Sequence, residues 1–147
     1  VEARHHLLEQ AARPEQVARL EQRRADRHVR AALAQALLDG GAYRGRRILT
    51  RESVELLITN FTPEFPEDSH GLGFELDQPW YMGEMSSPRT AGHTGYTGTS
   101  IVIDFSSRSF AILLTNRVHP SRDWGSINPA REAWANGLAR ARRRGAH

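Results

Sequence analysis

The residues with the most promising chemistry lie in one short segment, residues 92–100, which reads GHTGYTGTS. It combines an imidazole, the side chain that most often transfers protons in enzymes, with hydroxyl groups and glycines. By itself, however, His93-Thr94-Gly95 is an ordinary tripeptide, and a glycine-rich turn between two strands explains it equally well. The order of the surrounding elements decides between these interpretations.

Other kinds of site are disfavoured by what the sequence lacks. There is no Cys, which excludes a thiol nucleophile and Cys-based zinc sites. Ser100 follows Gly-Thr and does not stand in Gly-x-Ser-x-Gly, so a nucleophile elbow is not indicated. No His-Glu-x-x-His spacing occurs, and a metal site is not expected from the remaining candidates, His70, His93, His119 and Asp104. We therefore expect neither a metal nor a cofactor.

The segment leads into two predicted strands that form a hairpin. Residues 100–105 alternate, with the isoleucines on one face and Val102 on the other. Residues 110–114 are then apolar without interruption, the pattern of an interior strand that is covered on both faces. Nothing after this run, and nothing before residue 70, indicates a further strand. The sequence therefore predicts a sheet that lacks partner strands.

An amphipathic helix is predicted near the C-terminus. Asn128 is a suitable N-cap, and Pro129 suits the first helical position. Arginines in the last turns complement the negative end of the helix dipole. The apolar face is expected to consist of Ala130, Ala133, Trp134, Leu138 and Ala141.

Upstream of residue 92 the sequence predicts helices, turns and one more strand. Residues 15–38 favour a helix, which the sequence Asp-Gly-Gly at 39–41 is expected to end. Residues 43–46 are predicted to form a turn. Thr50 is expected to cap a short helix over residues 51–59.

Two further stretches precede the segment. A strand is predicted over residues 71–76, with its Leu and Phe side chains on one side. Residues 79–88 are predicted to be irregular. Trp80 and Tyr81 within them are expected to cover apolar surface.

The length and composition indicate one packed globular domain: 147 residues, 39% hydrophobic and 25% charged. No apolar run approaches the roughly 20 residues that a membrane-spanning helix needs. No secretory signal is readable at the start, and localisation is not predicted. The net charge of +3 is concentrated at the two ends of the chain. A nucleic-acid domain usually carries its basic residues on the folded body, so nucleic-acid binding is not expected.

The chain is predicted to divide near residue 30. Residues 1–30 form an atypical segment rich in Arg and Ala, helical or disordered, whereas residues 31–147 form the patterned domain. One interpretation of this contrast is a frame slip or a gene fusion upstream of Leu33.

The elements around residues 92–100 occur in a known order. The His93-Thr94-Gly95 box is followed by a glycine-rich turn, a long hairpin that ends in Leu-Thr-Asn, and an amphipathic helix. In this order the chain resembles the penicillin-recognising serine hydrolases: class C β-lactamases, DD-peptidases and related esterases. The resemblance covers about residues 33–143 and is to the C-terminal segment of such an enzyme. It implies a mixed α/β fold of the α+β type, an antiparallel sheet flanked by helices that lacks the N-terminal strands.

The resemblance also implies roles for four residues. Gly95 would let a substrate approach the strand closely, and Thr94 would offer its hydroxyl to a substrate carboxylate. His93, in place of the commoner Lys, would hydrogen-bond the catalytic base network, and the N–H of Tyr96 would be an oxyanion-hole donor. His93 and Tyr96 are thus candidate catalytic residues, and Thr94 and Gly95 candidate substrate-binding residues. The substrate would be a small molecule or a peptide.

The chain departs from this family at its catalytic centre. The nucleophile of the family lies in Ser-x-x-Lys, but this chain contains no Lys, so all 20 of its Lys and Arg residues are Arg. The second box, Tyr-x-Asn, is also absent, because each Tyr is followed two residues later by Gly. We therefore expect the C-terminal part of a serine hydrolase that cleaves amide or ester bonds, inactive by itself. The alternative is a non-catalytic module that binds a peptide or a partner. Oligomeric state is not predicted.

Overall fold

The computed structural model describes residues 14–123 and 125–145, which fall into two compact units. The first unit ends at Leu33 and contains most of helix α2 (Pro14–Leu38). The helix predicted over residues 15–38 is confirmed, since good helix formers fill this stretch and no Gly or Pro interrupts it. The part of the predicted segment 1–30 that precedes residue 14 lies outside the described residues.

The second unit, which begins at Ala34, contains the glycine-based end of α2. The N–H groups of Gly40 and Gly41 donate to the carbonyls of Leu37 and Ala36, at 3.0 and 2.8 Å. This pair of bonds is the Schellman cap, which satisfies carbonyls at the end of a helix. Both glycines have positive φ, 65° and 90°, so the predicted stop at residues 39–41 is confirmed.

A small hairpin and a short helix follow. Strands β1 (Ala42–Tyr43) and β2 (Arg46–Arg47) pair antiparallel, and the two residues between them both have positive φ, as a type I′ turn requires. Helix α3 (Arg51–Leu57) begins where predicted but ends before residue 59. The side chain of Thr50 accepts a hydrogen bond from the N–H of Ser53 at 3.1 Å, so the predicted cap is confirmed.

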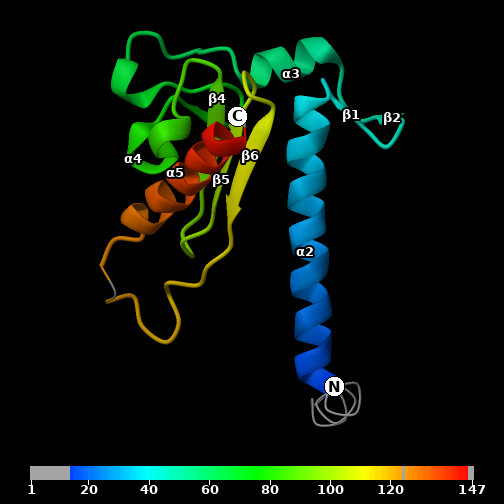
Figure 1. Cartoon of the computed structure of the whole chain (residues 1–147), viewed down its shortest axis with the longest axis vertical. Helices are drawn as coiled ribbons and strands as arrows, with labels where there is room; N and C mark the ends of the chain where they lie inside the picture. Colours follow the sequence, from blue (N-terminus) through cyan, green and yellow to red (C-terminus); the bar gives the residue numbers. More distant parts are fainter. Residues whose placement is uncertain (1–13, 124, 146–147) are drawn as a thin grey trace. The chain divides into compact units, whose positions relative to one another are not determined.

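The second unit is built on a four-stranded antiparallel sheet with the order β3-β4-β5-β6. Its strands β4, β5 and β6 are labelled in Figure 1. The predicted hairpin is its β5–β6 pair, in which Val102 stands opposite Ala111. The outer edge of β6 has no partner strand among the residues that the structure describes. The strands are β3 (Glu75–Leu76), β4 (Thr90–Thr94), β5 (Ser100–Asp104) and β6 (Ser109–Leu113).

Hydrophobic clusters cover both faces of this sheet, because successive side chains of a strand point to opposite sides. Val102 faces helix α5 (Asn128–Gly145) and the segment before β4, whereas Ile103 faces α3 and the end of α2. An antiparallel sheet flanked by helices is therefore confirmed. The first cluster consists of Tyr81, Met82, Met85, Val102, Ala111, Ala135 and Ala139. The second consists of Ala34, Leu37, Leu38, Val54 and Ile103.

The strand predicted over residues 71–76 is wrong in its extent. Only β3 (Glu75–Leu76) pairs with β4. Gly73 has a φ of 82°, which interrupts the extended backbone, and Leu72, expected on the buried side, is exposed.

The stretch predicted to be irregular, residues 79–88, contains α4 (Pro79–Met82) and a 3₁₀ turn. Figure 1 shows α4 beside α5. Tyr81 and Met82 are completely buried, whereas Trp80 remains exposed. An element of one helical turn has no period to recognise, so the sequence did not indicate it.

Helix α5 confirms the predicted start but buries a different face. Its buried residues are Arg131, Ala135 and Ala139, and Trp134 is 53% exposed. Small alanines let the helix lie close to α4, and Arg131 finds polar partners inside. Of the expected apolar face, Leu138 does pack against the first cluster. The face is wrong at its other four members, which are exposed: Ala130, Ala133, Trp134 and Ala141.

Candidate active site

The His93-Thr94-Gly95 box lies at the end of β4 that leads into the turn joining it to β5. His93 stands opposite Ile101, and Thr94 opposite Ser100. Since side chains alternate along a strand, the two residues direct their side chains to opposite faces of the sheet. The His93 side chain is exposed, and that of Thr94 is half-buried. The structure thus places the imidazole on the face of Ile101, away from α5.

The His93 imidazole has a defined orientation. Its Nδ1 lies 2.7 Å from the carbonyl oxygen of Thr94. A carbonyl can only accept a hydrogen bond, so Nδ1 donates in this contact and Nε2 is left for another partner. The ring can therefore accept a hydrogen bond at Nε2 when it is neutral.

The turn after the box depends on its glycines. The N–H of Gly95 donates to the carbonyl of Thr99 at 2.8 Å, and the N–H of Gly98 donates to the carbonyl of Gly95 at 2.9 Å. A Cβ on Gly95 would lie 2.2 Å from Oγ1 of Thr99, and Gly98 has a φ of 97°. The positive φ at residue 98 is thus demanded by the turn itself, whereas a Cβ at residue 95 would require the Thr99 side chain to move.

Tyr96 presents its two polar groups differently. Its ring is 66% exposed, and its hydroxyl accepts a hydrogen bond from Nη1 of Arg122 at 2.6 Å. Its backbone N–H has no acceptor within residues 14–123 and 125–145. A main-chain N–H without an internal acceptor is what an oxyanion hole requires, because the donor must be available to the ligand.

Arg131 is the residue of this site that the sequence analysis missed. It lies in the first turn of α5 with only 7% of its surface exposed. Its guanidinium donates to the carbonyls of Gly95, Gly98 and Thr99 at 2.7, 3.3 and 3.2 Å. Burial, together with the nearby Arg117, lowers its pKa. An arginine in a basic helix gives no sign of burial in the sequence. Its only signal is its place three residues after the predicted cap.

Tyr81 lies beneath β4 on the other face of the sheet from His93. A Cβ on Gly92 would lie 2.7 Å from the Tyr81 hydroxyl, and Glu75 stands opposite Gly92 on β3. Burial and the Glu75 carboxylate raise the pKa of Tyr81. The phenol therefore stays neutral and is poorly suited to act as a base.

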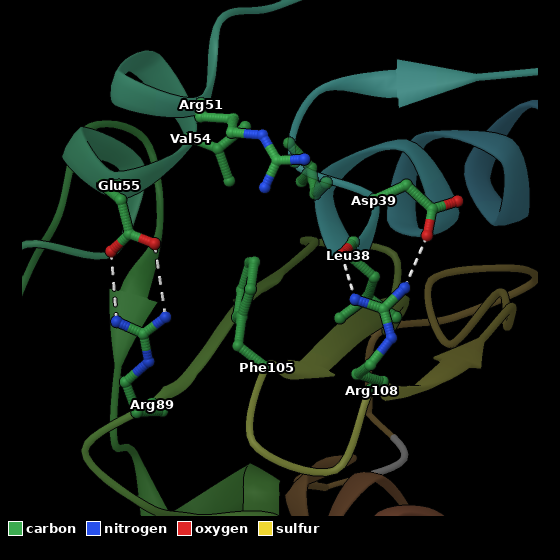
Figure 2. Close-up of a pocket in the computed structure, with 10 residues that line it drawn as sticks. Leu38, Asp39, Arg51, Val54, Glu55, Arg89, Phe105 and Arg108 are labelled. Atoms are coloured by element: carbon green, nitrogen blue, oxygen red, sulfur yellow. Dashed lines mark hydrogen bonds and ion pairs between the residues drawn. The ribbon is translucent and has the colours of Figure 1, made fainter. Parts of the chain in front are cut away.

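A hollow of about 430 Å³ lies at the opposite end of the sheet, next to the β5–β6 turn (Figure 2). On one side Arg89 forms two bonds with the Glu55 carboxylate, at 3.1 and 3.3 Å. On the other side Arg108 bonds Asp39 at 2.6 Å, and Phe105 stands between the two pairs (Figure 2). None of the four predicted site residues lines this hollow.

Metal binding and membrane insertion are the other two possibilities that the sequence raised. In the described part of the chain, no three His, Asp or Glu side chains are grouped so that they could hold a metal ion. His70 instead places its Nδ1 2.9 Å from the carbonyl of Asp68. None of the described helices is both long and apolar enough to cross a bilayer.

Comparison with known proteins finds both a matching family model and similar proteins. A family model described as Beta-lactamase matches residues 10–134. The chain is 34% identical over 110 residues to proteins from Salmonella typhi, Salmonella enteritidis and Salmonella gallinarum, provisionally named D-alanyl-D-alanine carboxypeptidases. The similarity covers 71% of this chain and 24% of each relative, so the chain spans about a quarter of their length. The family match begins before residue 31, where the patterned domain was expected to start.

Proposed function

Because this chain belongs to the β-lactamase family, we propose that it is the C-terminal part of a serine hydrolase that works through an acyl-serine. The complete enzyme would cleave an amide or ester bond. The names of the relatives favour the terminal amide of a peptide as the substrate class. The serine and its activating base would come from a segment outside these 147 residues.

One observation carries this proposal: the box is present on an accessible strand end, while the sequence contains no Lys. The family activates its serine with the lysine of Ser-x-x-Lys. An Arg guanidinium cannot replace that lysine, because it stays protonated and has no lone pair to accept a proton. This chain would therefore supply one wall of the active site and not the acylating group.

The wall would act on the substrate carbonyl and on its neighbouring groups. The free N–H of Tyr96 would stabilise the oxyanion of the tetrahedral intermediate, and the loss of such a donor typically costs about 10²–10³ in rate. His93 would hydrogen-bond the base network through Nε2, which its contact with the Thr94 carbonyl leaves available. Thr94 would offer its hydroxyl to a carboxylate, and the small size of Gly95 would admit the substrate backbone.

The outer edge of β6 gives independent support. This strand carries apolar side chains on both faces, yet its residues other than Ala111 are only half-buried. Covering one large apolar side chain contributes about 1.5–3 kcal/mol, and an open apolar edge promotes aggregation. A further strand from the rest of the enzyme would pair with the backbone groups of this edge. Elements packed beside that strand would cover the exposed apolar side chains.

Labelling with a fluorescent penicillin and with a fluorophosphonate tests the proposal. We expect no covalent adduct on the purified chain, whereas a full-length relative treated in parallel should be labelled. A labelled residue within this chain would overturn the assignment of the acylating group to another segment.

The coding DNA upstream of Val1 gives the complementary test. An intact Ser-x-x-Lys motif in any upstream frame would support the proposed hydrolase. An independent start with no such motif would refute it and favour the non-catalytic binding module.

A further inference from the structure

The peptide group between Gly95 and Tyr96 has one end held and the other free. Its carbonyl, that of Gly95, accepts hydrogen bonds from Nη2 of Arg131 at 2.7 Å and from the N–H of Gly98 at 2.9 Å. Its N–H, that of Tyr96, has no acceptor in the described part of the chain. In a planar trans peptide the C=O and N–H bonds point in opposite directions. Whatever holds the Gly95 carbonyl therefore also sets the direction of the Tyr96 N–H.

We propose that Arg131 is a positioning residue that orients the Tyr96 N–H toward the substrate. This inference rests on the proposed function, in which that N–H is an oxyanion-hole donor. Arg131 acts through the peptide group, by holding the carbonyl end on the side of α5 and so directing the N–H away from that helix.

The contacts of Arg131 leave its guanidinium little freedom. Besides Gly95, the group donates from Nε to the carbonyl of Gly98 at 3.3 Å and from Nη2 to the carbonyl of Thr99 at 3.2 Å. Nη1 donates to Oδ1 of Asn128 at 2.8 Å. A planar fork with donors on three nitrogens can hold all these acceptors at once, which a single ammonium group cannot do. The turn is thus tied to the first turn of α5 as a unit.

The positive charge of Arg131 strengthens these hydrogen bonds. Because that charge is nearly buried, it also requires them for compensation. The side chain is nearly buried, lies at the positive end of a helix dipole, and has Arg117 close enough to lower its pKa. No carboxylate forms a salt bridge with it among the described residues. The Glu75 carboxylate, which opposes this lowering of the Arg131 pKa, and the bonded carbonyl dipoles compensate the charge. Charge-assisted bonds of this kind are about twice as strong as neutral ones.

Gly95 explains why a positioning residue is needed here. A glycine fits the turn, since a Cβ would lie 2.2 Å from Oγ1 of Thr99. Glycine also has the least restricted backbone, so the peptide that follows it can rotate at low cost. Arg131 removes that freedom. Without it, the Gly95 carbonyl would keep only the bond from Gly98, and the direction of the Tyr96 N–H would be held less firmly.

The test is the residual dipolar coupling of the Tyr96 N–H in the ¹⁵N-labelled chain, which reports the direction of this bond relative to the rest of the unit. Arg131→Met removes the guanidinium and keeps an apolar side chain. Arg131→Lys keeps the charge but can reach fewer carbonyls. Arg142→Met is the matched control, because Arg142 lies on the same helix and contacts Asp104, at 3.3 Å, at the other end of the sheet.

We expect the wild-type coupling to fit the structure and the control variant to match it. In Arg131→Met the Tyr96 coupling should fall toward zero, while the couplings of β4 stay within error. Arg131→Lys should give an intermediate value. An unchanged Tyr96 coupling in a folded Arg131 variant would overturn the proposal, and so would equal changes throughout β4, which indicate a merely structural role. If Arg131→Met does not fold, Arg131→Lys gives the same decision. The readout needs no acylation, so failure of the proposed function is detected separately, by labelling.

Discussion

The two ends of the sheet are held together by arginines in different ways. At the end with the box, Arg131 is nearly buried and bonds to backbone carbonyls. At the end with the hollow, Arg89 and Arg108 are exposed and pair with the exposed carboxylates of Glu55 and Asp39, and Arg108 also donates to the Leu38 carbonyl at 2.6 Å (Figure 2). Exposed ion pairs contribute little to stability, whereas a buried acceptor that loses its donor is costly. The comparison predicts that loss of Arg131 costs more stability than loss of an exposed arginine at the other end.

The difference also bears on the proposed function. In the turn after the box, the carbonyls of Gly95, Gly98 and Thr99 are held by Arg131, whereas the N–H of Tyr96 has no acceptor among the described residues. A donor held in this way would be useful for stabilising charge. Ion pairs between flexible exposed side chains give no such order. Under the proposed function, the end with the box is the part of this chain that would contribute to catalysis.

Removing Arg131 should have the largest effect on stability. Arg131→Met leaves three backbone carbonyls without their guanidinium donor, and each unsatisfied buried group costs about 1–3 kcal/mol. Because Gly95 and Thr99 keep a second donor, we expect a loss of about 3 kcal/mol in the free energy of unfolding, measured with urea. The control Arg142→Met should lose less, about 1 kcal/mol, because the nearly buried Asp104 carboxylate keeps hydrogen bonds from Ser106 and Ser107. Equal losses in the two variants would remove the contrast between the ends.

Gly98→Ala should have the next largest effect. Its φ of 97° is unfavourable for any residue with a Cβ, and that atom would lie 2.4 Å from Oγ1 of Thr115. We expect a loss of about 2 kcal/mol, since left-handed strain alone costs about 1–2 kcal/mol. The turn at the other end already holds a non-glycine, Arg108, at a φ of 53°. Arg108→Gly should cost less than Gly98→Ala, because relieved strain partly offsets the lost bonds to Asp39 and to the Leu38 carbonyl. If Gly98→Ala lost less free energy of unfolding than Arg108→Gly, the result would contradict the comparison.

The ion pair at the hollow should have a small effect that depends on salt. A double-mutant cycle with Arg89→Met and Glu55→Gln should give a coupling of about 0.2–1 kcal/mol at low ionic strength. At 1 M salt, where the screening length is about 3 Å, the coupling should vanish. A coupling above about 2 kcal/mol that persists in salt would mean that this end is held as firmly as the other.

Acid should produce the smallest of the four effects. A hydrogen bond from Gln35 and the Arg108 guanidinium lower the pKa of Asp39 below its usual value of 3.8. The folded chain therefore binds this proton less readily than the unfolded chain, so the Asp39 contribution is present above pH 3.8 and is lost as the pH falls through the lower folded value. Asp39→Asn should flatten the stability profile in this acid range and leave the slope near pH 7 unchanged. An Asp39→Asn profile identical to that of the wild type below pH 4 would contradict this account.

Local signals made much of the fold predictable. The end of α2, the Thr50 cap and the β5–β6 hairpin each depend on residues within a few positions of one another. Helix α4 and strand β3 were missed or overextended because they are too short to show a period. The buried face of α5 was wrong because Arg131 and two alanines, not the larger Trp134, face inward.

The site was predictable only to the level of its residues. The order of the box, the turn, the hairpin and the helix indicated which residues to consider, and their catalytic roles stay predictions. The direction of the Gly95–Tyr96 peptide could not be predicted, because it depends on Arg131, which lies 36 residues away in the sequence. A contact of that range leaves no local pattern to recognise.

The most direct test of the central claim is the turnover of a chromogenic β-lactam and of an activated ester by the purified 147-residue chain. We predict no hydrolysis above the rate in buffer, with a full-length relative as the positive control, because no lysine is present to activate a serine. Saturable turnover with a kcat/KM of about 10⁴ M⁻¹s⁻¹ or more, the range of ordinary enzymes, would contradict this account.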